Sequence, residues 1–161
     1  MQISENSRIW IYQANRVFTH DEEKVIQQKM DDFTAQWLAH GNQLAAKGEI
    51  RYHQFLILSV DEQFAGATGC SIDKSVNLMK ELEQQYNINL FDRFRIAYRD
   101  GEEIINCDRE EFENLIRDGK LNSETLVFNN TITSRKELQT GWILPLKNSW
   151  HAQVFGNLLP A

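Results

Sequence analysis

The chain has 161 residues and a net charge of −6, with 42% hydrophobic and 25% charged residues. This composition is typical of a globular protein that buries its own core as one domain, here residues 1–161. The acidic balance argues against non-specific binding to nucleic acid or to an anionic membrane.

The N-terminal part of the chain predicts a strand and then a helix. Residues 9–12 are aromatic and β-branched, which favours a strand. Thr19 and Glu22 have the spacing of a capping box and predict the start of a helix, and Gly41 is expected to end it. The apolar stripe of this helix comprises Ile26, Met30, Phe33 and Trp37.

Residues 50–60, after a connecting loop over residues 42–48, predict one long strand. Its centre is apolar on both faces, which is typical of a central strand covered on both sides. A second helix is expected to start near Ser71 or Asp73. The apolar stripe of that helix comprises Ile72, Val76, Met79, Leu82 and Tyr86. The expected core combines the first stripe with Leu56, Leu58, Val76, Met79 and Leu82.

The C-terminal part of the chain predicts shorter elements. Residues 93–99 alternate charged and apolar side chains, and Asp100-Gly101 is a hairpin signal that makes residues 102–106 the return strand. Asp108 opens a short helix that Gly119 closes. Two short strands are expected at residues 125–128 and 142–146.

This order of elements predicts an α+β fold with a mixed sheet, two long helices packed against it, and a small C-terminal helix with short strands. The alternation of strand and helix in the first half suggests parallel pairing, whereas the hairpin requires antiparallel neighbours. A soft boundary within the single domain is expected near residue 108, after which helices and strands become shorter.

The loop between the long strand and the second helix is the best candidate for a ligand site. It contains Gly66 and Gly69, and it leads into Cys70, Ser71 and Asp73 at the helix start. Backbone N–H groups at a helix start lack intrahelical partners and favour anions, and small side chains let a ligand approach the backbone. As an alternative, Asp73 caps the helix itself and repels an incoming anion.

Cys70 is a candidate for a catalytic or redox thiol. A thiol beside a helix N-terminus can have a lowered pKa, although a small buried residue that packs the helix start is the alternative. Histidines that could partner the thiol are His20, His40, His53 and His151. Neither these histidines nor Cys107 show metal-ligand spacing, so the sequence predicts no metal site and no cofactor.

A second group of candidate ligand-binding residues follows the first strand. Asn15 and Arg16 could converge with Tyr12 on an anionic ligand. The alternative is local turn chemistry, in which Asn15 bends the chain and Arg16 pairs with Asp21 or Glu22.

Three segments carry a resemblance to a known family: residues 10–16, residues 69–73 and Ser149-Trp150-His151. The chain resembles, from Arg8 to Phe155, an uncharacterised family of bacterial proteins that are often labelled "ABC transporter ATPase". The motifs do not support that label, because the chain lacks a Walker A loop and the Leu-Ser-Gly-Gly-Gln signature, and because Asp73 precedes Lys74 where a phosphate would approach. We therefore expect no ATP hydrolysis.

The C-terminal part also resembles the small GYF-like modules of bacterial proteins. The resemblance rests on residues 112–121, on residues 125–130 and on Trp142, and it lacks the Gly-Tyr-Phe triplet. It implies a module that mediates interactions.

Location and function follow from what the sequence lacks. The first six residues have no signal-peptide pattern, the apolar run 55–58 is far shorter than the roughly 20 residues of a membrane helix, and two cysteines do not form a disulfide framework. The sequence therefore predicts a cytoplasmic, non-catalytic protein that binds a protein partner or a small ligand. The alternative is a small enzyme that uses Cys70 as a nucleophile or redox thiol.

Overall fold

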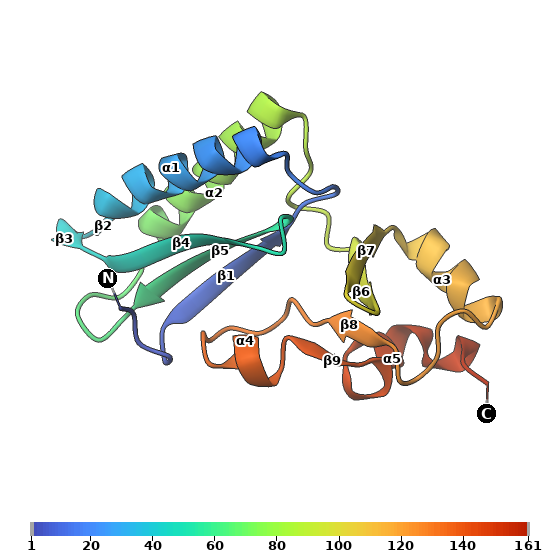
Figure 1. Cartoon of the computed structure of the whole chain (residues 1–161). Helices are drawn as coiled ribbons and strands as arrows, with labels where there is room; N and C mark the ends of the chain where they lie inside the picture. Colours follow the sequence, from blue (N-terminus) through green and yellow to red (C-terminus); the bar gives the residue numbers. More distant parts are fainter. Residues whose placement is uncertain (1, 161) are drawn as a thin grey trace. The chain divides into compact units, whose positions relative to one another are not determined.

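The computed structural model describes residues 2–160 and divides into two compact units (Figure 1). The first unit contains residues 2–91 and 133–136, and the second contains residues 92–132 and 137–160. The chain leaves the first unit at Phe91 and not near residue 108, because the hairpin that precedes residue 108 belongs to the second sheet. Among residues 2–160, no helix is long and apolar enough to cross a membrane.

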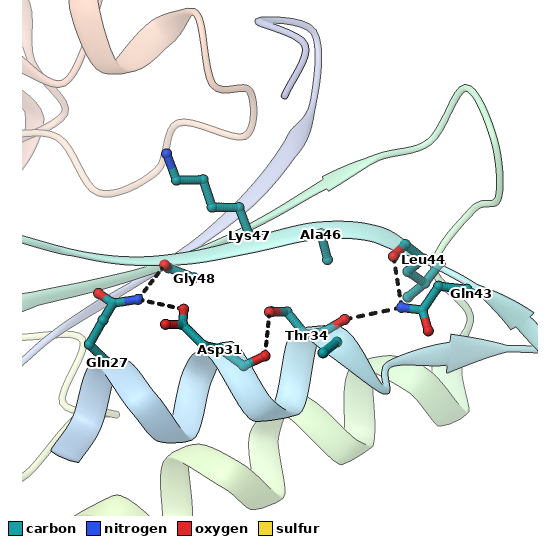
Figure 2. Close-up of a pocket in the computed structure, with 9 residues that line it drawn as sticks. Gln27, Asp31, Thr34, Gln43, Leu44, Ala46, Lys47 and Gly48 are labelled. Carbon is teal, nitrogen blue, oxygen red and sulfur yellow. Dashed lines mark hydrogen bonds between the residues drawn. The ribbon is translucent and has the colours of Figure 1, made fainter. Parts of the chain in front are cut away.

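The α+β fold class is confirmed, and the first unit is built on a three-stranded sheet in the order β1-β5-β4 (Figure 1). Its strands are β1 (Arg8–Gln13), β4 (Ala45–Arg51) and β5 (Phe55–Asp61). Both pairings are antiparallel, so the parallel pairing expected for the first half is not formed. β4 lies at the sheet edge, above the first helix (Figure 2).

The reason for the antiparallel order is a turn inside the segment expected to be one strand. Residues 50–60 reverse direction at Tyr52 and His53, which have φ of 52° and 60°, and the Gln54 amide donates to the Arg51 carbonyl at 3.2 Å. A bulky residue such as Tyr52 rarely adopts this left-handed conformation, and Tyr-His is not one of the dipeptides that mark a hairpin turn, so the sequence did not predict a turn here. The turn is held from outside, because the carbonyls of His53 and Gln54 accept hydrogen bonds from the amides of Phe18 and Ala14.

Two helices cover one face of this sheet. α1 (His20–Ala35) begins with the expected capping box between Thr19 and Glu22. It ends at Ala35, so Gly41 is not its C-cap but lies in the turn between β2 (Leu38–Ala39) and β3 (Asn42–Gln43), where its φ is 79°. α2 (Gly69–Tyr86) begins at Gly69, slightly earlier than expected, because Thr68 provides the N-cap.

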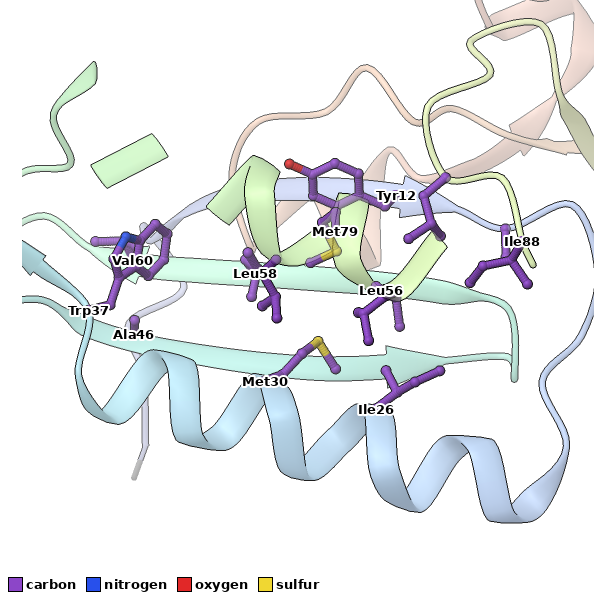
Figure 3. Close-up of a cluster of buried hydrophobic side chains, with 14 of the residues drawn as sticks. Tyr12, Ile26, Met30, Trp37, Ala46, Leu56, Leu58, Val60, Met79 and Ile88 are labelled. Carbon is purple, nitrogen blue, oxygen red and sulfur yellow. The ribbon is translucent and has the colours of Figure 1, made fainter. Parts of the chain in front are cut away.

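The core of the first unit lies between the sheet and these helices (Figure 3). Of the expected core residues, Ile26, Met30, Trp37, Leu56, Leu58, Met79 and Leu82 are buried, and Phe33 and Val76 are half-buried. Trp37 lies beyond the end of α1, and its indole N–H donates to the Ser71 carbonyl at 2.8 Å. Each fully buried large apolar side chain contributes about 1.5–3 kcal/mol to folding.

The second unit contains a four-stranded antiparallel sheet in the order β7-β6-β8-β9. The strands are β6 (Ile96–Asp100), β7 (Glu103–Cys107), β8 (Leu126–Phe128) and β9 (Ile143–Pro145), and the helices are α3 (Arg109–Arg117), α4 (Glu137–Thr140) and α5 (His151–Phe155). The expected hairpin turn is present, with φ of 64° at Gly101, and the Asp108 carboxylate caps α3 by accepting from the Glu111 amide. Residues 93–95 precede β6 and are not part of a strand.

Candidate functional site

The outer edge of β4 presents backbone groups that point away from the rest of the sheet. The Gly48 carbonyl accepts a hydrogen bond from Gln27 Nε2 at 2.9 Å, so it points away from β5. Alternate residues of an antiparallel edge strand share this direction, so Ala46, Gly48 and Ile50 turn their backbone N–H and C=O groups outward. Lys47 and Glu49 turn theirs toward β5.

α1 packs closely under this edge. A Cβ atom added to Gly48 would lie 2.7 Å from the Cβ of Met30, a residue that is fully buried. Such a distance is shorter than real Cβ contacts, so this position requires glycine for the approach of α1 to β4. The close approach fixes the position of Gln27 and Asp31 beside the edge (Figure 2).

An open groove of about 510 Å³ runs between α1 and the edge of β4 (Figure 2). Its walls come from α1, from β3 and the residue after it, and from β4. They comprise Gln27, Asp31, Thr34, Ala35, Gln43, Leu44, Ala46, Lys47 and Gly48. Leu44 and Ala46 form an apolar floor beside polar walls, which is the usual mixture of a binding site.

The charge on the groove wall is negative. The Asp31 carboxylate accepts a hydrogen bond from Gln27 Nε2 at 2.8 Å, and no cation pairs with it within residues 2–160. The last turn of α1 contains no basic residue, although the negative end of a helix dipole lies there. Figure 2 shows the Lys47 side chain on the other side of β4, pointing away from α1.

Gln43 closes the end of the groove near the C-terminus of α1. Its Nε2 atom donates to the carbonyls of Thr34, Trp37 and Leu44 at 3.1, 3.2 and 3.0 Å. Of these three residues only Thr34 belongs to α1, so Gln43 joins the last turn of the helix to the segment that follows it. The groove is therefore shaped by hydrogen-bonded side chains that the fold holds in place.

The loop before α2 was expected to bind a ligand. Its polar groups form hydrogen bonds with one another. The Thr68 hydroxyl accepts from the Ser71 amide at 3.3 Å, and the Ser71 hydroxyl accepts from the Thr68 amide at 2.7 Å, so the two residues form a capping box with Thr68 as the N-cap. The Glu62 carboxylate accepts from the Ala67 amide at 3.0 Å, which places a negative charge beside Gly66. Thr68, and not Asp73, provides the N-cap, and Asp73 is exposed in the first turn of the helix. A ligand at Gly66, Gly69, Cys70 or Ser71 stays a prediction.

Cys70 is exposed, but no hydrogen bond joins it to a histidine within the part of the chain that the structure describes. His53 lies before β5 and Cys70 lies after it, so one strand of about 20 Å separates them. His53 Nδ1 is 2.6 Å from the Glu23 carboxylate, and His151 Nδ1 is 2.7 Å from the Ser149 hydroxyl.

His151 belongs to the core of the second unit. Its ring stacks on Trp150 with 3.8 Å between centroids, and burial lowers the pKa of His151 to about 4. Burial is also the largest cause that raises the pKa of Cys107 to about 12. Trp142 is buried, and its indole N–H donates to Asn130 Oδ1 at 2.9 Å, so it forms no exposed aromatic patch.

Asn15 and Arg16 tie the start of α1 to the end of α2. Both terminal nitrogens of Arg16 bond the Glu22 carboxylate at 2.8 Å, and one of them also donates to the Tyr86 carbonyl at 2.8 Å. The hydrogen bond from Arg16 is the main cause that lowers the pKa of Glu22 to about 2. Asn15 Oδ1 accepts from the Asn89 amide at 2.9 Å. The ion pair expected as the alternative for Arg16 is therefore formed.

No protein-family model, curated protein or solved structure matches the chain. Within residues 2–160, the structure also contains no cluster of three or more side chains that could hold a metal ion. The candidate site therefore rests on geometry alone. Sequence reasoning missed the groove, although one signal was present: Ala46, Gly48 and Ile50 alternate with Lys47 and charged neighbours at the period of a half-exposed strand.

Proposed function

We propose that the protein is a non-catalytic binding protein that holds an extended segment of a partner polypeptide along β4. One observation carries this proposal: the outward-facing backbone groups of an edge strand lie directly beside an open groove. Strand addition to a sheet edge uses this combination, because main-chain hydrogen bonds supply affinity and side-chain pockets supply specificity.

In this arrangement the partner segment pairs with Ala46, Gly48 and Ile50. Its side chains alternate between the two faces of the sheet, so every second one points into the groove beside α1. The hydrogen bond from Gln27 does not prevent this pairing. The Gly48 carbonyl oxygen has two lone pairs, and the Gln27 side chain occupies only one of them. The seven residues of β4 match the length of an ordinary strand.

Peptides selected from a displayed library against the full chain test this function. Each selected peptide is made in two forms, N-methylated at its odd or at its even positions, because a methyl group removes a backbone donor without touching the protein. One form should lose binding, and the other should keep it. Residue-resolved amide exchange should show new protection at Ala46, Gly48 and Ile50, since the amides of Lys47 and Glu49 already pair with β5.

Two results would contradict the proposal. Equal binding of both methylated forms would show that no backbone pairing takes place. New protection confined to residues outside β4 would place the binding surface elsewhere.

The exposed thiol favours one alternative, an enzyme or redox protein that uses Cys70. Labelling with iodoacetamide at neutral pH distinguishes the two functions. A catalytic thiol would react at least about tenfold faster than free cysteine, because a lowered pKa exposes more thiolate. An ordinary rate would leave binding as the function that the geometry supports.

A further inference from the structure

We infer that the segment bound along β4 comes from a different polypeptide and places a lysine or arginine side chain against Asp31. This inference rests on the proposed function and names the chemistry of its partner. Two features of the groove carry it: the space left beside α1 and the charge on the groove wall.

The position of α1 argues against a second copy of this chain as the occupant. Pairing β4 with the β4 of another copy would bring the two strands about 5 Å apart. Each α1 lies under its own β4 (Figure 2), so an antiparallel pairing would place both helices on the same face of the joined sheet, where they compete for the space beside the edge. α1 cannot move away easily, because it is held against Gly48 by Met30 and Gln27. A single strand without a helix under it has no such conflict.

The groove wall supplies a negative charge without a partner cation. The carboxylate of Asp31 accepts from the amide of Gln27, no cation pairs with it in the described chain, and the adjacent end of α1 contains no basic residue. A lysine or arginine of the partner would complement both the carboxylate and the negative end of the helix dipole. Ala35 is exposed at the groove and offers apolar surface to the aliphatic stem of such a side chain.

The chain provides a matched pair of carboxylates for a test. Asp31 and Asp32 are neighbours on α1, both are exposed, and each accepts from the glutamine four residues earlier, Gln27 or Gln28. Only Asp31 lines the groove. A comparison of Asp31→Asn with Asp32→Asn therefore separates the groove from the general charge of the helix.

The experiment uses nine-residue peptides with alternating threonine and valine and one groove-facing position varied among Lys, Arg, Gln and Glu. Titration of the full chain should show that the Lys and Arg peptides bind about five- to tenfold more tightly than the Glu peptide, as expected for a partly exposed ion pair. Asp31→Asn should remove most of this preference, and Asp31→Lys should reverse it. Asp32→Asn should leave it unchanged, and added salt should weaken it in the parent chain.

Different results overturn the inference and the proposed function. Equal affinity for the Lys and Glu peptides, with sensitivity to alternate N-methylation retained, would refute the basic partner and leave strand binding intact. Equal effects of Asp31→Asn and Asp32→Asn would also refute it. A monomer that becomes a dimer with protected β4 amides would make a second copy the occupant. If both N-methylated forms of a peptide bind with the same affinity, strand binding itself is refuted.

Discussion

The two edges of the first sheet differ in which groups bond to their outward backbone N–H and C=O groups. At the β1 edge, the Ile9 amide donates to the Thr133 carbonyl at 3.0 Å, and the Arg135 amide donates to the Ser7 carbonyl at 2.9 Å. A segment from a distant part of the sequence thus pairs with β1. At the β4 edge, the side chain of Gln27 is the one described partner of the outward carbonyl of Gly48.

Within residues 2–160, a distant segment thus covers the β1 edge, whereas no strand pairs with the β4 edge. Exposed edges invite unwanted pairing, and proteins usually protect them with charges, bulges or covering segments. β4 has some of this protection, since Lys47, Glu49 and Arg51 lie along it. The groove at its side distinguishes β4 from an edge that is merely protected, and the following predictions test that distinction.

The largest effect is expected from Arg135→Ala, which releases the covering segment from the sheet. Arg135 Nη1 donates to Ser59 Oγ at 3.1 Å and forms an ion pair with Glu49, whose side chain is 12% exposed. Arg51 Nε stays 2.6 Å from the Glu49 carboxylate, but the variant loses the charge-assisted hydrogen bond to Glu49 and the hydrogen bond to Ser59. Unfolding in urea should therefore show a loss of about 3 kcal/mol. The amide of Ile9 should also exchange faster.

Lys147→Ala is the control for Arg135→Ala. Lys147 pairs with Glu124, and both side chains are more than half exposed, at 51% and 65%. Loss of an exposed pair should cost less than about 1 kcal/mol. If both variants lose the same free energy of unfolding, the covering of the β1 edge does not depend on Arg135.

A smaller loss is expected from Gly48→Ala at the open edge. The new methyl group would meet the Cβ of Met30 at 2.7 Å and force α1 away from β4. Overpacking of this kind costs about 2 kcal/mol, measurable by thermal or urea unfolding. Gly69→Ala is the matched control, because nothing lies within 4 Å of its added Cβ, and it should be neutral or stabilising. A neutral Gly48→Ala would mean that α1 is not fixed under β4.

Local signals predicted the helices and one hairpin well, because capping boxes and turn dipeptides act over a few residues. Thr19 with Glu22, and Asp100 with Gly101, are examples. The sequence did not predict the turn at Tyr52. The backbone there has a positive φ and is held by hydrogen bonds from residues far away in the sequence.

The candidate site could not be predicted for the same physical reason. Gln27 and Asp31 have the sequence pattern of any solvated helix face, and their role depends on the strand that α1 packs against. The covering of β1 by residues 133–136 has no local signal either, because it depends on pairing between distant segments. Sequence reasoning located the elements, and long-range contacts decided which edge stayed open.

The pH dependence of stability provides a further test of the covered edge, because Glu49 pairs with Arg135 of the covering segment. Burial raises the pKa of Glu49, but hydrogen bonds and charge from Arg135 and Arg51 outweigh it, so the net pKa is lowered. A lowered folded pKa stabilises the protein above the unfolded value of about 4.3, and this stabilisation is lost as the pH falls through the folded pKa. Urea unfolding from pH 6 down to pH 3 should show this loss in the parent chain. Arg135→Ala should reduce it, and an unchanged profile would exclude Glu49 as its source.

The smallest change in stability is expected from Gln27→Ala, which removes the side chain between Gly48 and Asp31. The groove is open to solvent, so water replaces the lost donor, and the free energy of unfolding should fall by less than about 1 kcal/mol. Strand peptides should bind more tightly, by about two- to fivefold, because they no longer share the carbonyl and carboxylate with the amide. Gln28→Ala is the control, since Gln28 bonds Asp32 outside the groove. If Gln27→Ala weakens peptide binding instead, the amide contacts the partner directly, and Gln27 is part of the binding surface and not a cover over the open edge.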